Sequence, residues 1–208
     1  MFEKMLTKKT VRKFLISIII GLAITSAITD YSQSVMADIT SSVVRLHILA
    51  NSDSNEDQSL KIKVRDDIIA YLEPLLETAE NVEKTKEIIA SNIELIEKEV
   101  EKSIKKHGYA YSATAVLGKS EFPQKSYEGA TFPAGKYDAL KIIIGDGNGQ
   151  NWWCVLYPQL CFSCSQNGEL PTTSKTKLKN VLTDDEYKII TSKDEIKFKL
   201  KIVEMFSR

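Results

Sequence analysis

Residues 145–161 read GDGNGQNWWCVLYPQLC, in which three glycines within five residues lead into two adjacent tryptophans. Glycine is the residue that a tight turn needs where φ becomes positive. The run from Trp152 to Tyr157 is rich in aromatic and β-branched residues and is ended by Pro158, which predicts a strand. Neighbouring side chains of a strand point to opposite faces, so the two tryptophans should lie on opposite sides of a sheet. One ring can then fill a core while the other meets a covering segment or a partner, or both can be core.

The glycine-rich turn does not predict a ligand site. Its spacing is not that of a P-loop or a dinucleotide fingerprint, it leads into a strand, and no acidic residue follows at the distance that a calcium loop requires. The two histidines, His47 and His107, stand in different settings, which argues against a zinc site. The sequence therefore predicts no cofactor and no metal. We expect the turn to join strands 136–144 and 152–157 as a hairpin.

Charge is distributed unevenly along the chain. Of its 28 basic and 28 acidic residues, five and two respectively lie in residues 1–37, which leaves residues 38–208 with a net charge of −3. Nucleic-acid-binding domains carry a basic patch or stripe, and a mildly acidic domain has no general attraction for nucleic acid. We therefore expect no nucleic-acid partner.

The amino terminus has the pattern of an export segment. A basic leader, residues 1–13, precedes a 15-residue apolar run at 14–28. As a helix this run would cover roughly 22 Å of a hydrocarbon core about 30 Å thick, which suits a secretory signal better than a permanent anchor. Positive charge before the run predicts that the rest of the chain is exported. Residues 1–37 are thus a signal peptide or a membrane anchor, and contact with the membrane should occur only through them.

The middle of the chain, residues 38–164, predicts one α+β domain. A strand at 42–50 precedes two helices with apolar stripes, and several strands follow. We expect two antiparallel helices packed on a mainly antiparallel sheet in two layers, behind the amino-terminal signal or anchor helix. The expected elements are strand 42–50, helices 55–75 and 81–106, and strands 109–117, 126–131, 136–144 and 152–157. Residues 165–208 form a polar carboxyl-terminal extension with a short helix near 184–190.

Polar residues gather where the first strand meets the first helix. Ser54 and Asp57 have the three-residue spacing of a capping box. Gln58, Lys61 and Arg65 share one polar stripe of the helix, and Asp57 stands four residues before Lys61 in the favourable order for an ion pair. A solvated surface is the simplest interpretation of this stripe. Two alternatives, a recognition surface and a polar network that holds the junction rigid, follow only from the family resemblance given below.

Three cysteines, Cys154, Cys161 and Cys164, fall within eleven residues. Outside the cytoplasm a disulfide is permitted, but with an odd number at most two can pair within the chain. The sequence is compatible with a structural disulfide, with buried free thiols and with a catalytic cysteine. The chemical alternative is a nucleophilic Cys154 with His47 as its base, which requires the two side chains to lie within hydrogen-bond reach.

Three blocks of the sequence resemble the stage II sporulation protein R family. They are residues 44–53 (VRLHILANSD) with the polar positions that follow, residues 132–140 (FPAGKYDAL) and residues 151–161 (NWWCVLYPQLC). The blocks stand in the family's order and span about residues 43 to 162. Cys154 and Cys161 are the cysteine pair that matches the family, so the resemblance makes them the candidate disulfide.

The resemblance implies a function by binding. Members of the family are exported from the forespore to the intermembrane space, where they activate a membrane-embedded aspartic protease that processes the mother-cell sigma factor precursor. On this basis we expect a non-enzymatic signalling protein with the protease as its partner. The candidate partner-binding residues are Arg45, His47, Asn51, Asp53, Gln58, Lys61, Arg65, Trp152 and Trp153. The alternative function is an extracytoplasmic cysteine-dependent hydrolase.

Overall fold

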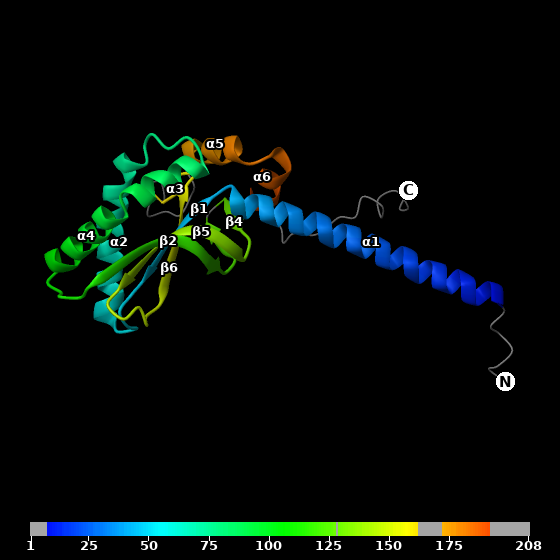
Figure 1. Cartoon of the computed structure of the whole chain (residues 1–208), viewed down its shortest axis with the longest axis horizontal. Helices are drawn as coiled ribbons and strands as arrows, with labels where there is room; N and C mark the ends of the chain where they lie inside the picture. The colour runs from blue at the N-terminus through cyan, green and yellow to red at the C-terminus, as the bar shows by residue number, and fades with distance from the viewer. Residues whose placement is uncertain (1–7, 128, 162–171, 192–208) are drawn as a thin grey trace. The chain divides into compact units, whose positions relative to one another are not determined.

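The computed structural model describes residues 8–127, 129–161 and 172–191 (Figure 1). The chain divides into two compact units, Met1–Asp38 and Ile39–Arg208. Cys164 lies outside the described residues, and so does the carboxyl-terminal extension except for residues 172–191.

The first unit consists of most of helix α1 (Lys8–Ser41). The predicted apolar run at 14–28 lies inside this helix, and its large side chains, such as Phe14 and Leu22, are exposed. The segment Lys9–Ser41 is long and apolar enough to cross a membrane. This is compatible with the expected signal or anchor.

The second unit contains all the other described elements (Figure 1). Its strands are β1 (Val44–Leu49), β2 (Ala113–Phe122), β3 (Lys125–Tyr127), β4 (Ala130–Phe132), β5 (Gly135–Ile144) and β6 (Asn151–Tyr157). Its helices are α2 (Asn55–Leu75), α3 (Val82–Ser91), α4 (Ile93–Lys106), α5 (Thr172–Val181) and α6 (Asp184–Thr191). The main sheet has the order β2-β5-β1-β6, and β3 pairs with β4 in a separate small sheet.

The core lies between one face of the main sheet and helices α2, α3 and α4 (Figure 1). Val44, Leu46 and Ile48 of β1 face these helices, as the alternation of the strand predicts. The helices meet them with the apolar stripes that their periodicity predicts, which include Leu60, Val64, Ile68 and Leu72 of α2 and Ile96, Val100 and Ile104 of α4. The predicted two-layer α+β class is confirmed.

The predicted hairpin between the last two strands is wrong. Strand β1 lies between β5 and β6, parallel to the first and antiparallel to the second. The glycine-rich turn therefore crosses the carboxyl end of β1, where the N–H groups of Asn148 and Gly149 donate to the carbonyls of Asn51 (3.1 Å) and Ala50 (2.9 Å). The turn connects strands that are not neighbours, so it is held by β1 and the residues that follow it.

Other element boundaries also differ from the prediction. The strand expected from residue 109 begins only at Ala113, and the expected strand 126–131 is the pair β3 and β4. The expected helix 81–106 is two helices, because Asn92 ends α3 and its side chain donates to the carbonyl of Ile88 (2.8 Å). Such local bonding by asparagine competes with continuous helix. Strand β2 does not end at Leu117 but continues through Gly118 to Phe122, since it pairs with β5 along its whole length.

The carboxyl-terminal helices are partly buried. The predicted helix near 184–190 is confirmed as α6, whereas α5 was not predicted. Leu178, Leu182 and Ile190 are buried, and α6 contacts β4. Residues 172–191 therefore belong to the packed unit, although the sequence around them is polar.

Asp67 links α2 to the end of α4. Its carboxylate accepts from Ser103 Oγ (2.6 Å) and Lys106 Nζ (2.7 Å), and His107 Nε2 lies 2.9 Å away. Burial alone would raise the pKa of Asp67, but the hydrogen bonds from Lys106, Ser103 and His107 outweigh it and lower the pKa from 3.8 to about 2. The carboxylate therefore stabilises the folded state only while it is ionised.

We expect Asp67→Asn to lower the free energy of unfolding at pH 7 by about 1 kcal/mol, a figure reduced because a quarter of the side chain is exposed. The contribution of a carboxylate with a lowered pKa is complete above its ordinary pKa and is lost as the pH falls toward 2. The wild type should therefore lose stability between about pH 4 and pH 2 more steeply than the variant. Urea unfolding at a series of pH values measures this, and parallel pH profiles would contradict it.

Candidate functional site

The junction of β1 and α2 is a network of hydrogen bonds. Ser54 caps α2 as predicted, with its Oγ accepting from the N–H of Asp57 (3.2 Å). The buried carboxylate of Asp57 does not accept from the N–H of Ser54, as a full capping box requires. It accepts instead from Ser52 Oγ (2.6 Å) and Asn51 Nδ2 (2.8 Å). These bonds, that from Ser52 first, lower the pKa of Asp57. The capping box is therefore only half formed, and Asp57 fixes the two residues that leave the strand.

The same junction holds the glycine-rich turn. Lys61 Nζ donates to Gln58 Oε1 (2.6 Å) and to the carbonyl of Gln150 (2.9 Å), while Asp53 Oδ1 accepts from the N–H of Gln150 (2.7 Å). Lys61 is only 5% exposed, and burial lowers its pKa. The expected ion pair of Asp57 with Lys61 is not formed. The interpretation of this stripe as a solvated surface is wrong for Lys61, which joins two segments about ninety residues apart.

Arg45 is fully buried on the opposite face of the sheet from α2. Its Nε donates to the carbonyl of Cys154 (2.8 Å) and its Nη2 to Tyr127 Oη (3.0 Å). Its guanidinium lies 4.5–5.9 Å from the centres of four aromatic rings, those of Phe122, Tyr127, Phe132 and Tyr137. Burial lowers its pKa. Arg45 was expected to contact a partner, but the small β3–β4 sheet and Phe122 cover it, so in this structure it cannot.

His47 and Trp153 form a pair on the same face. Their rings stack with centroids 3.9 Å apart, and Phe122 packs on Trp153 at 4.5 Å. His47 Nε2 lies 2.7 Å from Asn151 Oδ1, and burial lowers the pKa of the imidazole. Trp153 is only half-buried, so this pair keeps an accessible edge.

Trp152 lies on the other side of the sheet, as predicted for neighbours in a strand. It packs against the helix-side core, and the guanidinium of Arg65 lies 5.2 Å from the centre of its ring. Both side chains are partly exposed. The prediction that the two tryptophans point to opposite faces is confirmed.

Cys154 and His47 are not arranged for catalysis. Cys154 and Cys161 form a disulfide with Cα atoms 5.8 Å apart, and both belong to the core on the helix side. Cys154 pairs with Leu46 of β1, while His47, the next residue, faces the opposite side. The thiol and the imidazole of the hydrolase hypothesis are therefore separated by the sheet.

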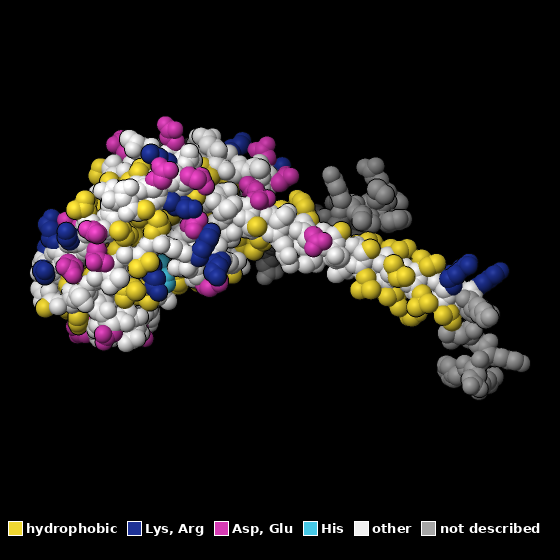
Figure 2. Space-filling view, in the orientation of Figure 1, with side chains coloured by type: hydrophobic (Ala, Val, Ile, Leu, Met, Phe, Trp, Pro, Cys, Tyr) yellow, Lys and Arg dark blue, Asp and Glu magenta, His cyan; other side chains and the backbone are white. Residues whose placement is uncertain are grey.

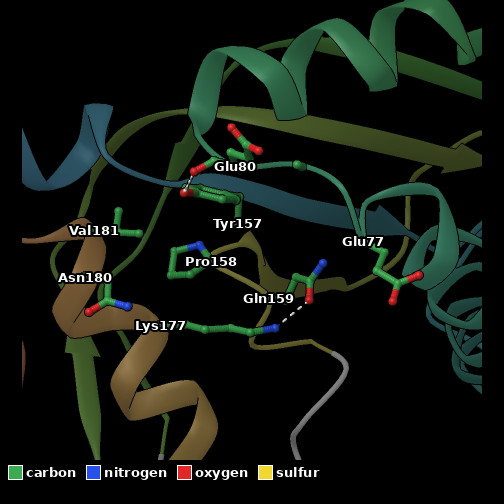
Figure 3. Close-up of a pocket in the computed structure, with 9 residues that line it drawn as sticks. Glu77, Glu80, Tyr157, Pro158, Gln159, Lys177, Asn180 and Val181 are labelled. Atoms are coloured by element: carbon green, nitrogen blue, oxygen red, sulfur yellow. Dashed lines mark hydrogen bonds between the residues drawn. The ribbon is translucent and has the colours of Figure 1, made fainter.

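A polar groove lies where β6 ends (Figure 3). One part has a volume of about 230 Å³, and a second part of about 330 Å³ shares Glu80, Tyr157, Asn180 and Val181 with it. Two hydrogen bonds join lining residues: Tyr157 Oη donates to the carbonyl of Glu80 (2.6 Å) and Lys177 Nζ to Gln159 Oε1 (2.7 Å). Sequence reasoning missed this groove, because it depends on α5 packing beside a segment far away in the sequence.

The nine candidate residues therefore do not form one surface. Asn51, Asp53, Gln58 and Lys61 hold the junction, Arg65 and Trp152 lie at the helix side of β6, and Arg45, His47 and Trp153 lie on the opposite face. Among the described residues, no group of three or more histidine, cysteine, aspartate or glutamate side chains is placed to hold a metal ion.

Comparison with known proteins assigns the chain to a family. The model of the family described as stage II sporulation protein R matches residues 40–167. The chain is 36% identical over 163 residues to "Stage II sporulation protein R" of Bacillus subtilis (strain 168), an alignment that covers 76% of this chain and 73% of the relative. No solved structure gives a significant match. The chain therefore belongs to the stage II sporulation protein R family, and this relation supports a role in sporulation.

Proposed function

We propose that this chain is an exported sporulation signal that binds a membrane-embedded aspartic protease and activates it to process the mother-cell sigma factor precursor. Family membership over residues 40–167 carries the proposal, because the resemblance implies this role for the family. The folded unit Ile39–Arg208 would act in the intermembrane space after export from the forespore. Export is supported by the apolar helix that precedes this unit.

The arrangement of side chains favours binding over bond cleavage. Cys154 is held in a disulfide on the helix side of the sheet, and His47 lies on the other side, so the hydrolase hypothesis has no thiol and base in contact. A binding protein activates a partner only through its higher affinity for the active state. Moving an equilibrium from 1:99 to 99:1 requires a difference in affinity of about 10⁴-fold.

Several of the expected contact residues remain accessible for this binding. Asp53 is exposed at the junction, and Arg65, Trp152 and Trp153 are partly exposed. Arg45 and Lys61 are buried and would act only by supporting the surfaces around them.

The proposal is tested by reconstitution in a bacterium that does not sporulate. The full chain, the protease and an epitope-tagged sigma factor precursor are produced together, and the processed precursor is measured by immunoblot. We expect processing only when all three are present. Unprocessed precursor in cells that export the folded chain beside a folded protease would contradict the proposal.

The double variant Cys154→Ala/Cys161→Ala separates binding from cysteine chemistry. Because the proposed activation does not use a thiol, we expect the variant to support processing to the extent that it folds. Far-UV circular dichroism of the purified variant controls for folding. A folded variant that supports no processing would favour the cysteine-dependent hydrolase.

A further inference from the structure

The face of the main sheet that is turned away from α2, α3 and α4 carries a continuous row of side chains. Val116 of β2 pairs with Lys141 of β5, Lys141 with His47 of β1, and His47 with Trp153 of β6. In the next row Ile143 of β5 pairs with Leu49 of β1. We call these six residues the open face.

Four of the six residues of the open face are apolar, and the face is incompletely covered. Nearer the start of β1, the same side of the sheet is closed by the aromatic side chains around Arg45. Toward the end of β1 this aromatic cover stops, and the turn at Gly147 lies against Ile143 and Leu49. Val116 is 46% exposed, and Leu49, Ile143 and Trp153 are half-buried. Figure 2 shows hydrophobic side chains at the surface over the region of the strands.

An apolar face is unexpected at this place if nothing binds there. Strands β1 and β5 form a parallel pair, and parallel strands are ordinarily covered on both faces. A sheet face that stays in water usually carries polar side chains. This one carries the polar residues Thr114, Lys141 and Asn151, but also Val116, Leu49, Ile143 and Trp153. Contiguous apolar patches of this kind mark interaction sites.

Lys141 indicates the charge of the occupant. It lies in the middle of the first row, between Val116 and His47, and is partly buried. None of the ion pairs of the described residues includes Lys141. A partly desolvated ammonium group among apolar side chains selects a partner that supplies a carboxylate.

We propose that the open face docks an amphipathic helix of a partner protein, with an aspartate or glutamate on the helix placed opposite Lys141. The interior of a sheet face presents side chains rather than free backbone groups, so it suits the apolar stripe of a helix rather than an added strand. A second copy of this chain fits less well. A two-fold interface uses the same patch on both subunits, and the open face has no carboxylate to meet Lys141 of a second copy. The inference rests on the proposed function in one respect only, the identity of the protein that supplies the helix.

The test uses the reconstituted cells with the full chain. We expect Lys141→Glu and Val116→Asp each to reduce processing of the precursor by more than about tenfold, because each places a repulsive or desolvated charge in the contact. The matched controls lie on α4, on the other side of the sheet: Lys98→Glu, and Leu95→Asp at a position that is 53% exposed. Both controls should process like the wild type. Equal processing by Lys141→Glu, Val116→Asp and the wild type would overturn the proposal, and circular dichroism checks that all four variants fold.

A photo-cross-linker at position 116 identifies the occupant. We expect a cross-link to a helical segment with an acidic residue, and we expect changing that residue to lysine to restore the activity of Lys141→Glu. A cross-link between two copies of this chain, or none to any protein, would overturn the proposal. If the wild type supports no processing, the proposed function fails separately. The docking proposal is then tested in sporulating cells with the same cross-linker at position 116. It predicts that Lys141→Glu removes the cross-link, and that changing the acidic residue of the partner helix to lysine restores it.

Discussion

Replacing Arg45 with alanine is expected to lower the free energy of unfolding by about 4 kcal/mol. The change empties a space bounded by Phe122, Phe132 and the ring of Tyr137, and large-to-small changes in a core are among the most destabilising substitutions. It also leaves the carbonyl of Cys154 and the hydroxyl of Tyr127 without the donor that Arg45 provides. Urea unfolding followed by circular dichroism measures the loss, and a loss below about 1 kcal/mol would contradict this account.

Arg45→Met separates the volume of the side chain from its charge. Methionine fills most of the same space and removes a charge that has no carboxylate partner among the described residues. Such replacements are often close to neutral. We expect a loss of about 1–2 kcal/mol, mainly from the loss of the two hydrogen bonds that Arg45 donates. Because Arg45 is buried, the methionine variant should still support processing of the precursor. Equal destabilisation by alanine and methionine would show that the stabilising contribution of Arg45 comes mainly from its hydrogen bonds and not from filling the space between the aromatic rings.

The parts of this fold that were predictable are those set by local pattern. The apolar stripes of α2 and α4, the cap at Ser54, and the opposite placement of Trp152 and Trp153 follow from residues close together in the sequence. Each depends on a helical or strand period or on one side chain that bonds to a nearby N–H. Such features need no knowledge of how distant segments meet.

The parts that were missed depend on distant pairing. Whether β5 and β6 form a hairpin is decided by β1, which comes about ninety residues earlier and inserts between them. Lys61 and Arg65 occupy the same helical stripe, yet only Lys61 is buried, because the backbone of Gln150 reaches it and not Arg65. The covering of Arg45 likewise depends on the β3–β4 sheet. A polar residue at a surface period is therefore not enough to predict a binding surface.

The turn that follows β5 shows how closely the junction is packed. Gly145 has a φ of +57°, and a Cβ there would also collide with the side chain of Asn51. At Gly149 the constraint is contact alone. A Cβ would lie 2.6 Å from the carbonyl carbon of Ser52, closer still to its oxygen, and 2.9 Å from the Cβ of Ala50. The obstructing atoms are backbone on the segment that Asp57 holds, so they cannot move aside without breaking that network.

Gly149→Ala is therefore expected to lower the free energy of unfolding by about 3 kcal/mol, the upper range for forcing a methyl group into a packed site. Gly118→Ala is the matched control, because its backbone is not in the left-handed region and no atom lies within 4 Å of the added Cβ. We expect the control to change stability by less than about 0.5 kcal/mol, or to raise it slightly by restricting the unfolded chain. Urea midpoints of the two variants measure the difference. Equal midpoints would mean that the turn and the β1–α2 junction separate at little cost, and the junction residues would then have to be explained by contact with another molecule.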